Sequence, residues 1–298
     1  MHAEAVIKES QTTNSTKKSL QVFNTVKEFR LWREEMTGTV GFVATMGALH
    51  EGHLSLIKLA RKLSDHLVVS IFVNPLQFGP KEDFGNYPRT MERDLELCSE
   101  LQVDAVFTPE VEQIYPEGKD LCTKIIPPPY LGDVLEGAFR PGFFTGVATI
   151  VAKLFNIIKP DFTIFGEKDY QQLLVVKRMV SDLNMPVTVY GAPIVRAEDG
   201  LALSSRNAYL SEYHRKMAPS IYQTLKIAAE KIRMNPASVQ ESINLAKRQL
   251  KETGVIDLQY LEARDGETLA EISSFNKKIV LLAAAKIGTT RLIDNIVI

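Results

Sequence analysis

The sequence predicts an α/β protein: a Rossmann-like, doubly wound parallel sheet with a second, smaller α+β C-terminal domain. Between residues 22 and 190, short β-rich runs alternate with amphipathic segments, a pattern typical of a parallel sheet with helices on both faces. Beyond residue 196, two long helical stretches precede strand-like segments. A length of 298 residues predicts one large or two modest domains, and the change of pattern favours two, over residues 19–194 and 195–298.

The strands of the first domain are predicted from short apolar runs rich in β-branched and aromatic residues. They cover residues 40–45, 67–73, 104–108, 162–165 and 187–190. Helices are predicted where apolar residues recur with the spacing of one helix face. They cover residues 26–35, 54–64, 89–101, 145–158 and 170–183.

The smaller domain is predicted to begin with helices over residues 212–234 and 236–252. Strands are expected at 256–261 and 278–283, with a loop or short helix over 262–276. At the other end of the chain, residues 1–18 are polar and lack the apolar core of a secretory signal, so we expect a disordered extension.

Composition argues against several function classes. The 35 Lys and Arg residues balance 36 Asp and Glu residues, which gives no general attraction to nucleic acid or to an anionic membrane. A long apolar stretch, residues 147–158, is interrupted by Lys153 and Asn156 and is too short to cross a bilayer. The two cysteines, Cys98 and Cys122, have no metal or redox spacing and suggest reduced thiols in the cytoplasm.

The run from Met46 to His53 is the most informative motif. It follows the strand predicted at 40–45 and holds two histidines three residues apart, His50 and His53. A helix start supplies unpaired N–H groups and a positive dipole end, so phosphate binding is the functional interpretation. The alternative is an ordinary turn between a strand and a helix, without a bound ligand. A zinc site is a weaker one, because the protease motif needs histidines four residues apart and no third ligand is evident.

Three further segments make sense as parts of the same site. Residues 166–169, Gly-Glu-Lys-Asp, also lie between a strand and a helix, where Lys168 would neutralise phosphate and Asp169 would bind a ribose hydroxyl. Residues 203–206, Leu-Ser-Ser-Arg, offer hydroxyls and a guanidinium that suit a triphosphate. Gln77 follows another strand and suits a hydroxy acid. For these three segments, helix capping and solvated loops are the alternatives. The sequence contains no dinucleotide fingerprint, Walker A loop or nucleophile elbow.

Together with residues 135–147, these segments resemble the pantoate–β-alanine ligase family, over residues 20–298 and in the expected order and spacing. The family belongs to the nucleotidyltransferase superfamily with its His-x-Gly-His motif. One departure is Leu203, where the family often has methionine, and a volume-conserving swap should matter little.

The resemblance implies ATP and Mg²⁺ as cofactors, pantoate and β-alanine as substrates, and a homodimer. Gln77 and Gln172 would bind pantoate, and His53 would take the proton-donor role. The catalytic residues would be His53, His50, Lys168, Ser204, Ser205 and Arg206. The ATP site would comprise Met46, Gly47, Ala48, Leu49, His50, Glu51, Gly52, His53, Gly166, Glu167, Lys168, Asp169, Val195, Leu203, Ser204, Ser205 and Arg206.

The implied reaction forms pantoyl adenylate and then pantothenate, releasing pyrophosphate and AMP. Residues 78–87 have glycines near both ends of a polar stretch and are predicted to form a lid that keeps water from the adenylate. Another adenylate-forming enzyme of the superfamily, or a nucleotide-binding module without catalysis, is the alternative.

Overall fold

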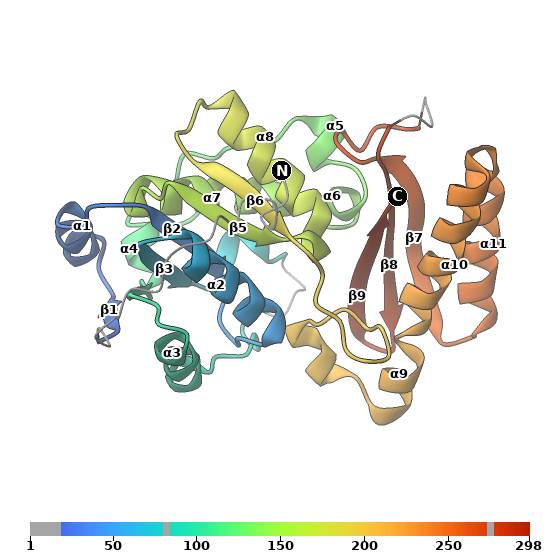
Figure 1. Cartoon of the computed structure of the whole chain (residues 1–298), viewed down its shortest axis with the longest axis horizontal. Helices are drawn as coiled ribbons and strands as arrows, with labels where there is room; N and C mark the ends of the chain where they lie inside the picture. The colour runs from blue at the N-terminus through green and yellow to red at the C-terminus, as the bar shows by residue number, and fades with distance from the viewer. Residues whose placement is uncertain (1–18, 80–83, 273–276) are drawn as a thin grey trace.

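The structure is a computed structural model that describes residues 19–79, 84–272 and 277–298. The predicted N-terminal extension lies outside the described residues, as do residues 80–83 of the predicted lid. The blue-to-yellow part of the chain forms one body, and the orange and red part packs beside it (Figure 1).

The first body is built on a six-stranded, wholly parallel sheet with the order β1-β4-β3-β2-β5-β6. From β2 the chain proceeds outward through β3 and β4, and β5 then returns to pair with the other side of β2. The order reverses between β2 and β5, and such a switch point is where doubly wound sheets bind ligands. The strands are β1 (Gln21–Phe23), β2 (Val40–Thr45), β3 (His66–Ile71), β4 (Ala105–Phe107), β5 (Phe162–Gly166) and β6 (Thr188–Ala192).

Helices cover both faces of this sheet (Figure 1). Helices α1, α7 and α8 share one core with Phe42 and Phe107, whereas α2 and α3 share another with Val43 and Val106. Neighbouring strand residues face opposite sides, so the sheet is buried on both faces and its strands are almost wholly apolar. The helices are α1 (Val26–Glu34), α2 (Glu51–Leu63), α3 (Met91–Glu100), α7 (Phe143–Ile158) and α8 (Tyr170–Asp182).

Several short helical turns connect these elements. None of them was predicted, because one turn has too few residues to show a helical period. They are η2 (Pro75–Gln77), α4 (Val111–Ile114), α5 (Pro129–Gly132), α6 (Glu136–Phe139) and η3 (Glu167–Asp169).

The second body is a three-stranded antiparallel sheet of β7 (Ile256–Asp265), β8 (Ile279–Ile287) and β9 (Thr290–Val297). Side chains of β8 at Leu281 and Ala283 pack under α10 and α11, while Leu282 and Ala284 join the core of the first body. The α/β fold with a smaller α+β part is thus confirmed. The remaining helices are α9 (Glu212–Met217), η4 (Ser205–Tyr209), α10 (Ser220–Met234), η5 (Pro236–Ser238) and α11 (Val239–Glu252).

Some predicted bounds were wrong. The helix expected over 212–234 is two helices, with Pro219 at the start of the second. The helix expected at 236–252 begins with the 3-10 turn η5, and β7 continues into the segment predicted as loop or helix. Strands β1 and β9 were missed: β1 has three residues, and β9 carries polar side chains whose burial depends on distant partners.

Candidate functional site

The two histidines form the N-terminal cap of α2, which begins at Glu51 and not at 54 as predicted. His50 is the N-cap, and its Nδ1 accepts the N–H of Gly52 at 3.1 Å. The Nδ1 of His53 accepts the N–H of His50 at 3.4 Å, and the two ring centroids are 4.1 Å apart. Since each Nδ1 is an acceptor, each neutral ring must carry its proton on Nε2. Each ring therefore has an Nε2–H that can donate to a ligand.

Both rings are held in the neutral form. Burial, together with smaller effects of the nearby His50 and Lys168, lowers the pKa of His53 to about 3. Burial, followed by the charge of Lys168, also lowers the pKa of His50. At neutral pH both rings are hydrogen-bond donors without charge, and cationic side chains must supply the positive charge of the site.

The loop before the histidines is shaped by Asp94, a residue of α3 that the sequence analysis did not identify. Its buried carboxylate accepts the N–H of Ala48 at 2.9 Å and of Leu49 at 2.8 Å. Gly47 and Ala48 have positive φ angles of 82° and 50°, so the backbone turns sharply toward this acceptor. Asp94 therefore fixes the approach to the histidine cap.

The second predicted segment forms the 3-10 turn η3 between β5 and α8. Asp169 stands at the N-cap of α8 without making a capping hydrogen bond, and its Oδ1 lies 3.8 Å from the Nζ of Lys168. The Asp169 side chain is therefore not the acidic cap of α8. Strands β2 and β5 are neighbours, so this turn and the histidine cap lie at adjacent strand ends.

The third predicted segment folds back on the stretch of chain that follows β6. The N–H of Leu203 donates to the carbonyl of Val195 at 3.0 Å, across a hairpin that turns at Gly200. Ser204 then caps η4, its hydroxyl accepting the N–H of Arg206 at 3.3 Å. Ser205 and Arg206 thus begin the 3-10 turn η4, whereas Leu203 and Ser204 precede it in extended chain.

Gln77 is held at the end of the neighbouring strand β3 by a buried network. Its Oε1 accepts from Asn74 Nδ2 at 3.0 Å, and Asn74 Oδ1 accepts from the Tyr115 hydroxyl at 2.8 Å. Arg140 donates to the carbonyl of Gln77 at 3.1 Å and stacks on Phe143 at 3.7 Å from the ring centroid. Asn74 thus holds the side-chain oxygen of Gln77, and Arg140 holds its backbone.

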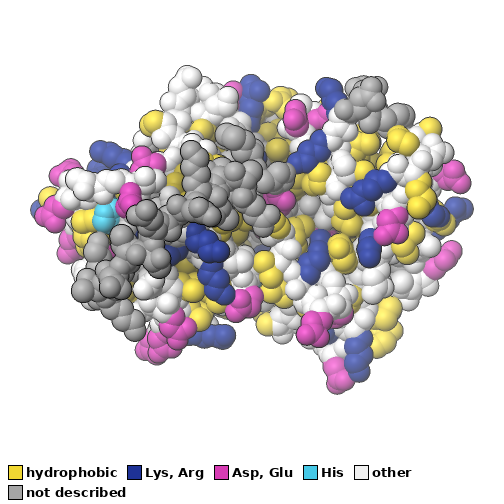
Figure 2. All heavy atoms as spheres, in the orientation of Figure 1, with side chains coloured by type: hydrophobic (Ala, Val, Ile, Leu, Met, Phe, Trp, Pro, Cys, Tyr) yellow, Lys and Arg dark blue, Asp and Glu magenta, His cyan; other side chains and the backbone are white. Residues whose placement is uncertain are grey.

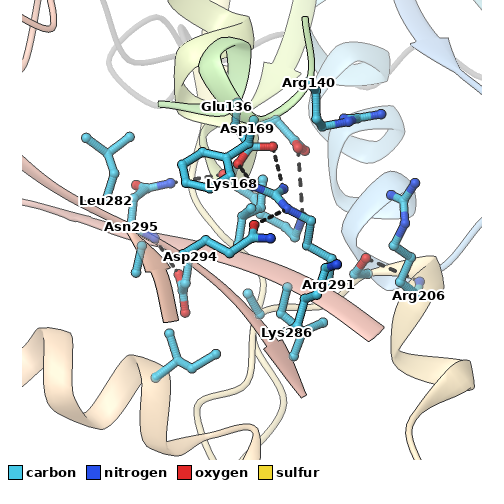
Figure 3. Close-up of a pocket in the computed structure, with 18 of the residues that line it drawn as sticks. Glu136, Arg140, Lys168, Asp169, Arg206, Leu282, Lys286, Arg291, Asp294 and Asn295 are labelled. Atoms are coloured by element: carbon cyan, nitrogen blue, oxygen red, sulfur yellow. Dashed lines mark hydrogen bonds and ion pairs between the residues drawn. The ribbon is translucent and has the colours of Figure 1, made fainter. Parts of the chain in front are cut away.

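Two adjoining cavities bring these segments together. The histidine cavity has a volume of about 230 Å³, and the central cavity, which borders the second sheet, about 680 Å³. Arg140, Lys168, Asp169, Gln172 and Arg206 line both, so the two are parts of one cleft. Figure 3 shows Lys168, Asp169 and Arg206 around the central cavity, with Arg291 and Asn295 on the facing strand.

Most of the predicted site residues line the histidine cavity. They are Met46, His50, Gly52, His53, Gln77, Gly166, Lys168, Asp169, Gln172, Val195, Leu203, Ser204, Ser205 and Arg206. Five predicted residues, Gly47, Ala48, Leu49, Glu51 and Glu167, line neither cavity. Ala48 and Leu49 contribute backbone N–H groups to Asp94 instead, and the side chain of Glu51 is exposed.

Arg140 and Phe143 line both cavities and were not assigned a role from the sequence. The signal available was their place in the segment 135–147, where an arginine stands among glycines and aromatic residues. Asp94 has no comparable signal in the sequence, since it is simply a carboxylate in the first turn of an amphipathic helix.

Within the described ranges, no group of three His, Cys, Asp or Glu side chains is placed to hold a metal ion, so the zinc alternative gains no support. In the same ranges, no helix combines the length and apolarity needed to cross a membrane.

Comparison with known proteins decides between the remaining functions. The sequence model described as "Pantoate-beta-alanine ligase" matches residues 21–297. The chain belongs to the pantoate-beta-alanine ligase family. The expected family, and with it the expected class of carbon–nitrogen bond-forming ligase, is therefore confirmed.

Individual relatives match over nearly the whole chain. The pantothenate synthetase of Acinetobacter baumannii is 52% identical over 86% of this chain and 89% of its own length. The crystal structure of pantothenate synthetase from Thermus thermophilus has a TM-score of 0.87 at 47% identity, covering 93% of this chain and 98% of that one. The ligase from Francisella tularensis, complexed with beta-gamma ATP and beta-alanine, has a TM-score of 0.76 at 36% identity, covering 93% and 97%.

Proposed function

We propose that the chain condenses pantoate with β-alanine to form pantothenate, consuming ATP through a pantoyl adenylate and releasing pyrophosphate and AMP. Family membership supports the reaction, and the nucleotide and β-alanine named for the Francisella tularensis relative support the substrates. The observation that carries the proposal is the histidine cavity, where loops from β2, β3 and β5 and the 203–206 segment line one space at the switch point.

In the first half-reaction a carboxylate oxygen of pantoate attacks the α-phosphorus of ATP, and the bond to pyrophosphate breaks. The carboxylate is ionised at neutral pH, so this step needs no base but does need alignment and charge neutralisation. The Nε2–H groups of His50 and His53 would donate to phosphate oxygens as charge moves onto the leaving group. Lys168 and Arg206 would supply positive charge, and Ser204 and Ser205 further donors.

The remaining roles follow the positions around the cleft. Residues 166–169 and Val195 would bind the adenosine, and Gln77 and Gln172 would bind pantoate. Asn74 holds the Oε1 of Gln77, and an amide side chain can both donate to and accept from a hydroxy acid. In the second half-reaction the amine of β-alanine attacks the acyl carbon, and AMP leaves.

Magnesium fits this site as a companion of the nucleotide. Mg²⁺ usually keeps water and substrate phosphate oxygens as ligands and takes only one or two carboxylates from the protein. Asp169 is the acidic side chain that lines the histidine cavity among the described residues, so it would be the protein's contribution. When bound, the ion would neutralise phosphate charge.

We also propose a homodimer in the cytoplasm. Large apolar side chains are exposed along one short segment: Leu121 is 80% exposed and Ile126 76%. Exposed apolar surface of this kind marks interaction sites. Leu121→Glu should halve the mass measured by light scattering, whereas Met234→Glu, at a residue 87% exposed elsewhere, should not change it.

The division into domains stays a proposal, with residues 195–298 as the smaller unit that carries the Ser-Ser-Arg segment. Acidic and basic side chains are interspersed on the face that Figure 2 shows, so beyond a second copy of the chain we propose only small-molecule partners.

The proposed reaction is tested by pantoate-dependent exchange of labelled pyrophosphate into ATP, without β-alanine. We expect exchange with pantoate and, on addition of β-alanine, net AMP formation. Exchange that requires an amino acid would indicate a synthetase-like enzyme. No exchange with any acid would indicate a nucleotide-binding module, and either result would contradict the proposal.

A further inference from the structure

Strand β9 of the second sheet reaches the catalytic turn of the first body through one buried amide. Asn295 is 3% exposed, and its Nδ2 donates to the carbonyl oxygens of Glu167 at 2.8 Å and Lys168 at 3.0 Å. These carbonyls belong to η3, the turn whose Lys168 and Asp169 side chains line both cavities. Figure 3 shows Asn295 on the strand that faces Lys168 and Asp169.

The amide itself is held firmly. The neighbouring Asp294 forms a bidentate ion pair with Arg196 at 2.6 and 2.7 Å, and it also accepts the N–H of Asn295. Arg196 donates to the carbonyl of Asn295 at 3.3 Å as well. A bidentate arginine–carboxylate pair has a defined geometry, so the backbone that carries the amide has little freedom to move.

The turn itself is short and has no side-chain cap. Asp169 makes no capping hydrogen bond at the start of α8, and η3 is only one turn long. Without Asn295 the two partly buried carbonyls would lose this shared donor, and the turn would have to shift to find others. A shift of the turn moves the lysine that faces the histidines.

We propose that Asn295 is a positioning residue for adenylation: its side-chain amide fixes the η3 turn and thereby places Lys168 against the phosphates of ATP. This inference rests on the proposed function through the role given to Lys168. The second sheet would then contribute to the first half-reaction, although β9 is far from residues 166–169 in the sequence.

The test compares Asn295→Leu, similar in size but without a donor, with Asn295→Ser, a milder change that admits water. Arg33→Met is the matched control, because Arg33 also donates to two consecutive carbonyls, those of Ile158 and Lys159, away from both cavities. We expect both Asn295 variants to slow single-turnover pyrophosphate release, about tenfold for Leu, and to raise KM for ATP but not for pantoate. Arg33→Met should lower only stability.

Two further measurements separate positioning from general damage. When Asn295→Leu is added to the Lys168→Met variant, the double variant should carry out adenylation less than twofold more slowly than Lys168→Met alone. The His50 ring, titrated by NMR, should show a raised pKa in Asn295→Leu, since the charge of Lys168 lowers it in the wild type. In Arg33→Met that pKa should not change.

If Lys168→Met slows adenylation while the Asn295 variants do not, or if the two effects multiply fully, the positioning role is wrong and the proposed function stands. If Lys168→Met leaves adenylation unchanged, the role of Lys168 in the proposed function fails, and the inference about Asn295 fails with it.

Discussion

At the residue scale, the histidine cap gives the same atoms two duties. Nδ1 of each ring supports the start of α2, which leaves Nε2–H for the ligand. A substitution to alanine removes both duties at once, so its effect on activity mixes catalysis with the loss of a cap.

His50→Asn separates the two duties. Asparagine is among the best N-cap residues, so the helix start should keep its stability, whereas His50→Ala should lose about 1 kcal/mol. Both variants lack the ring N–H, and we expect both to slow pantoate-dependent pyrophosphate release by about 100-fold or more. Urea unfolding and single-turnover kinetics measure the two effects. An active His50→Asn would mean that the ring serves only as a cap.

The lowered pKa of His53 predicts a loss of stability in acid. The native ring binds a proton only near pH 3, whereas the unfolded ring binds one near 6.5, so the native state is favoured above pH 6.5 and loses this contribution as the pH falls toward 3. His53→Gln, which suits the third helical position of a capping box, does not titrate. The free energy of unfolding should therefore fall less steeply between pH 6.5 and 4 in this variant. If the free energy of unfolding changed with pH equally in the wild type and in His53→Gln, the lowered pKa of His53 would be contradicted.

At this scale the sequence predicted most of the residues that line the histidine cavity but not the residues that support them. His50, His53 and Lys168 were found because they follow strands, where a parallel sheet binds its ligands. Asp94, Asn74 and Asn295 act through buried hydrogen bonds to backbone from elements far away in the chain. Such contacts depend on tertiary packing and leave no periodic signal in the sequence.

At the scale of elements, the close approach of α7 and η2 depends on a single glycine. A Cβ built on Gly146 would lie 2.3 Å from the carbonyl oxygen of Leu76, much closer than real Cβ atoms approach. The carbonyl of Gly146 also accepts from Asn74 Nδ2 at 3.2 Å. The position of Gln77, the last residue of η2, is therefore set by contact with this helix.

Gly146→Ala should push η2 away from α7 and displace Gln77. We expect KM for pantoate to rise at least tenfold, with a smaller change in KM for ATP, because the histidine cap lies on other elements. Steady-state kinetics with each substrate varied gives the comparison. Alanine at Gly142, the N-cap of α7, where a built Cβ meets nothing within 4 Å but φ is 80°, strains the start of the helix without pushing on η2 and is the control. Unchanged pantoate kinetics in Gly146→Ala would show that η2 adapts.

Elements with a clear period were the predictable ones. The long helices and the central strands were predicted from apolar spacing. Both faces of the sheet are covered by a core, so each of these elements has a regular set of buried apolar residues. Strand β9 carries Arg291, Asp294 and Asn295, and its place is decided by the partners of those polar side chains. Its pattern in the sequence is correspondingly weak.

At the scale of the whole molecule, the two sheets are joined by a buried ion pair as well as by a shared core. Glu136 of α6, 6% exposed, accepts from both terminal nitrogens of Arg291 on β9 and from the hydroxyl of Tyr260 on β7. Figure 3 shows this contact across the central cavity. The same core cluster contains Phe144 of the first body and Leu282 of the second, so we expect wild-type unfolding in one cooperative transition.

Removing one member of this pair should cost far more than removing both. Arg291→Met would leave the Glu136 carboxylate buried beside the Tyr260 hydroxyl without its cation, and we expect a loss of about 3–5 kcal/mol in the free energy of unfolding. In the double variant Glu136→Gln, Arg291→Met no charge is buried, so much of that loss should be recovered. Urea unfolding followed by circular dichroism measures both. If the single and double variants were equally destabilised, packing of the arginine stem rather than charge pairing would join the two sheets.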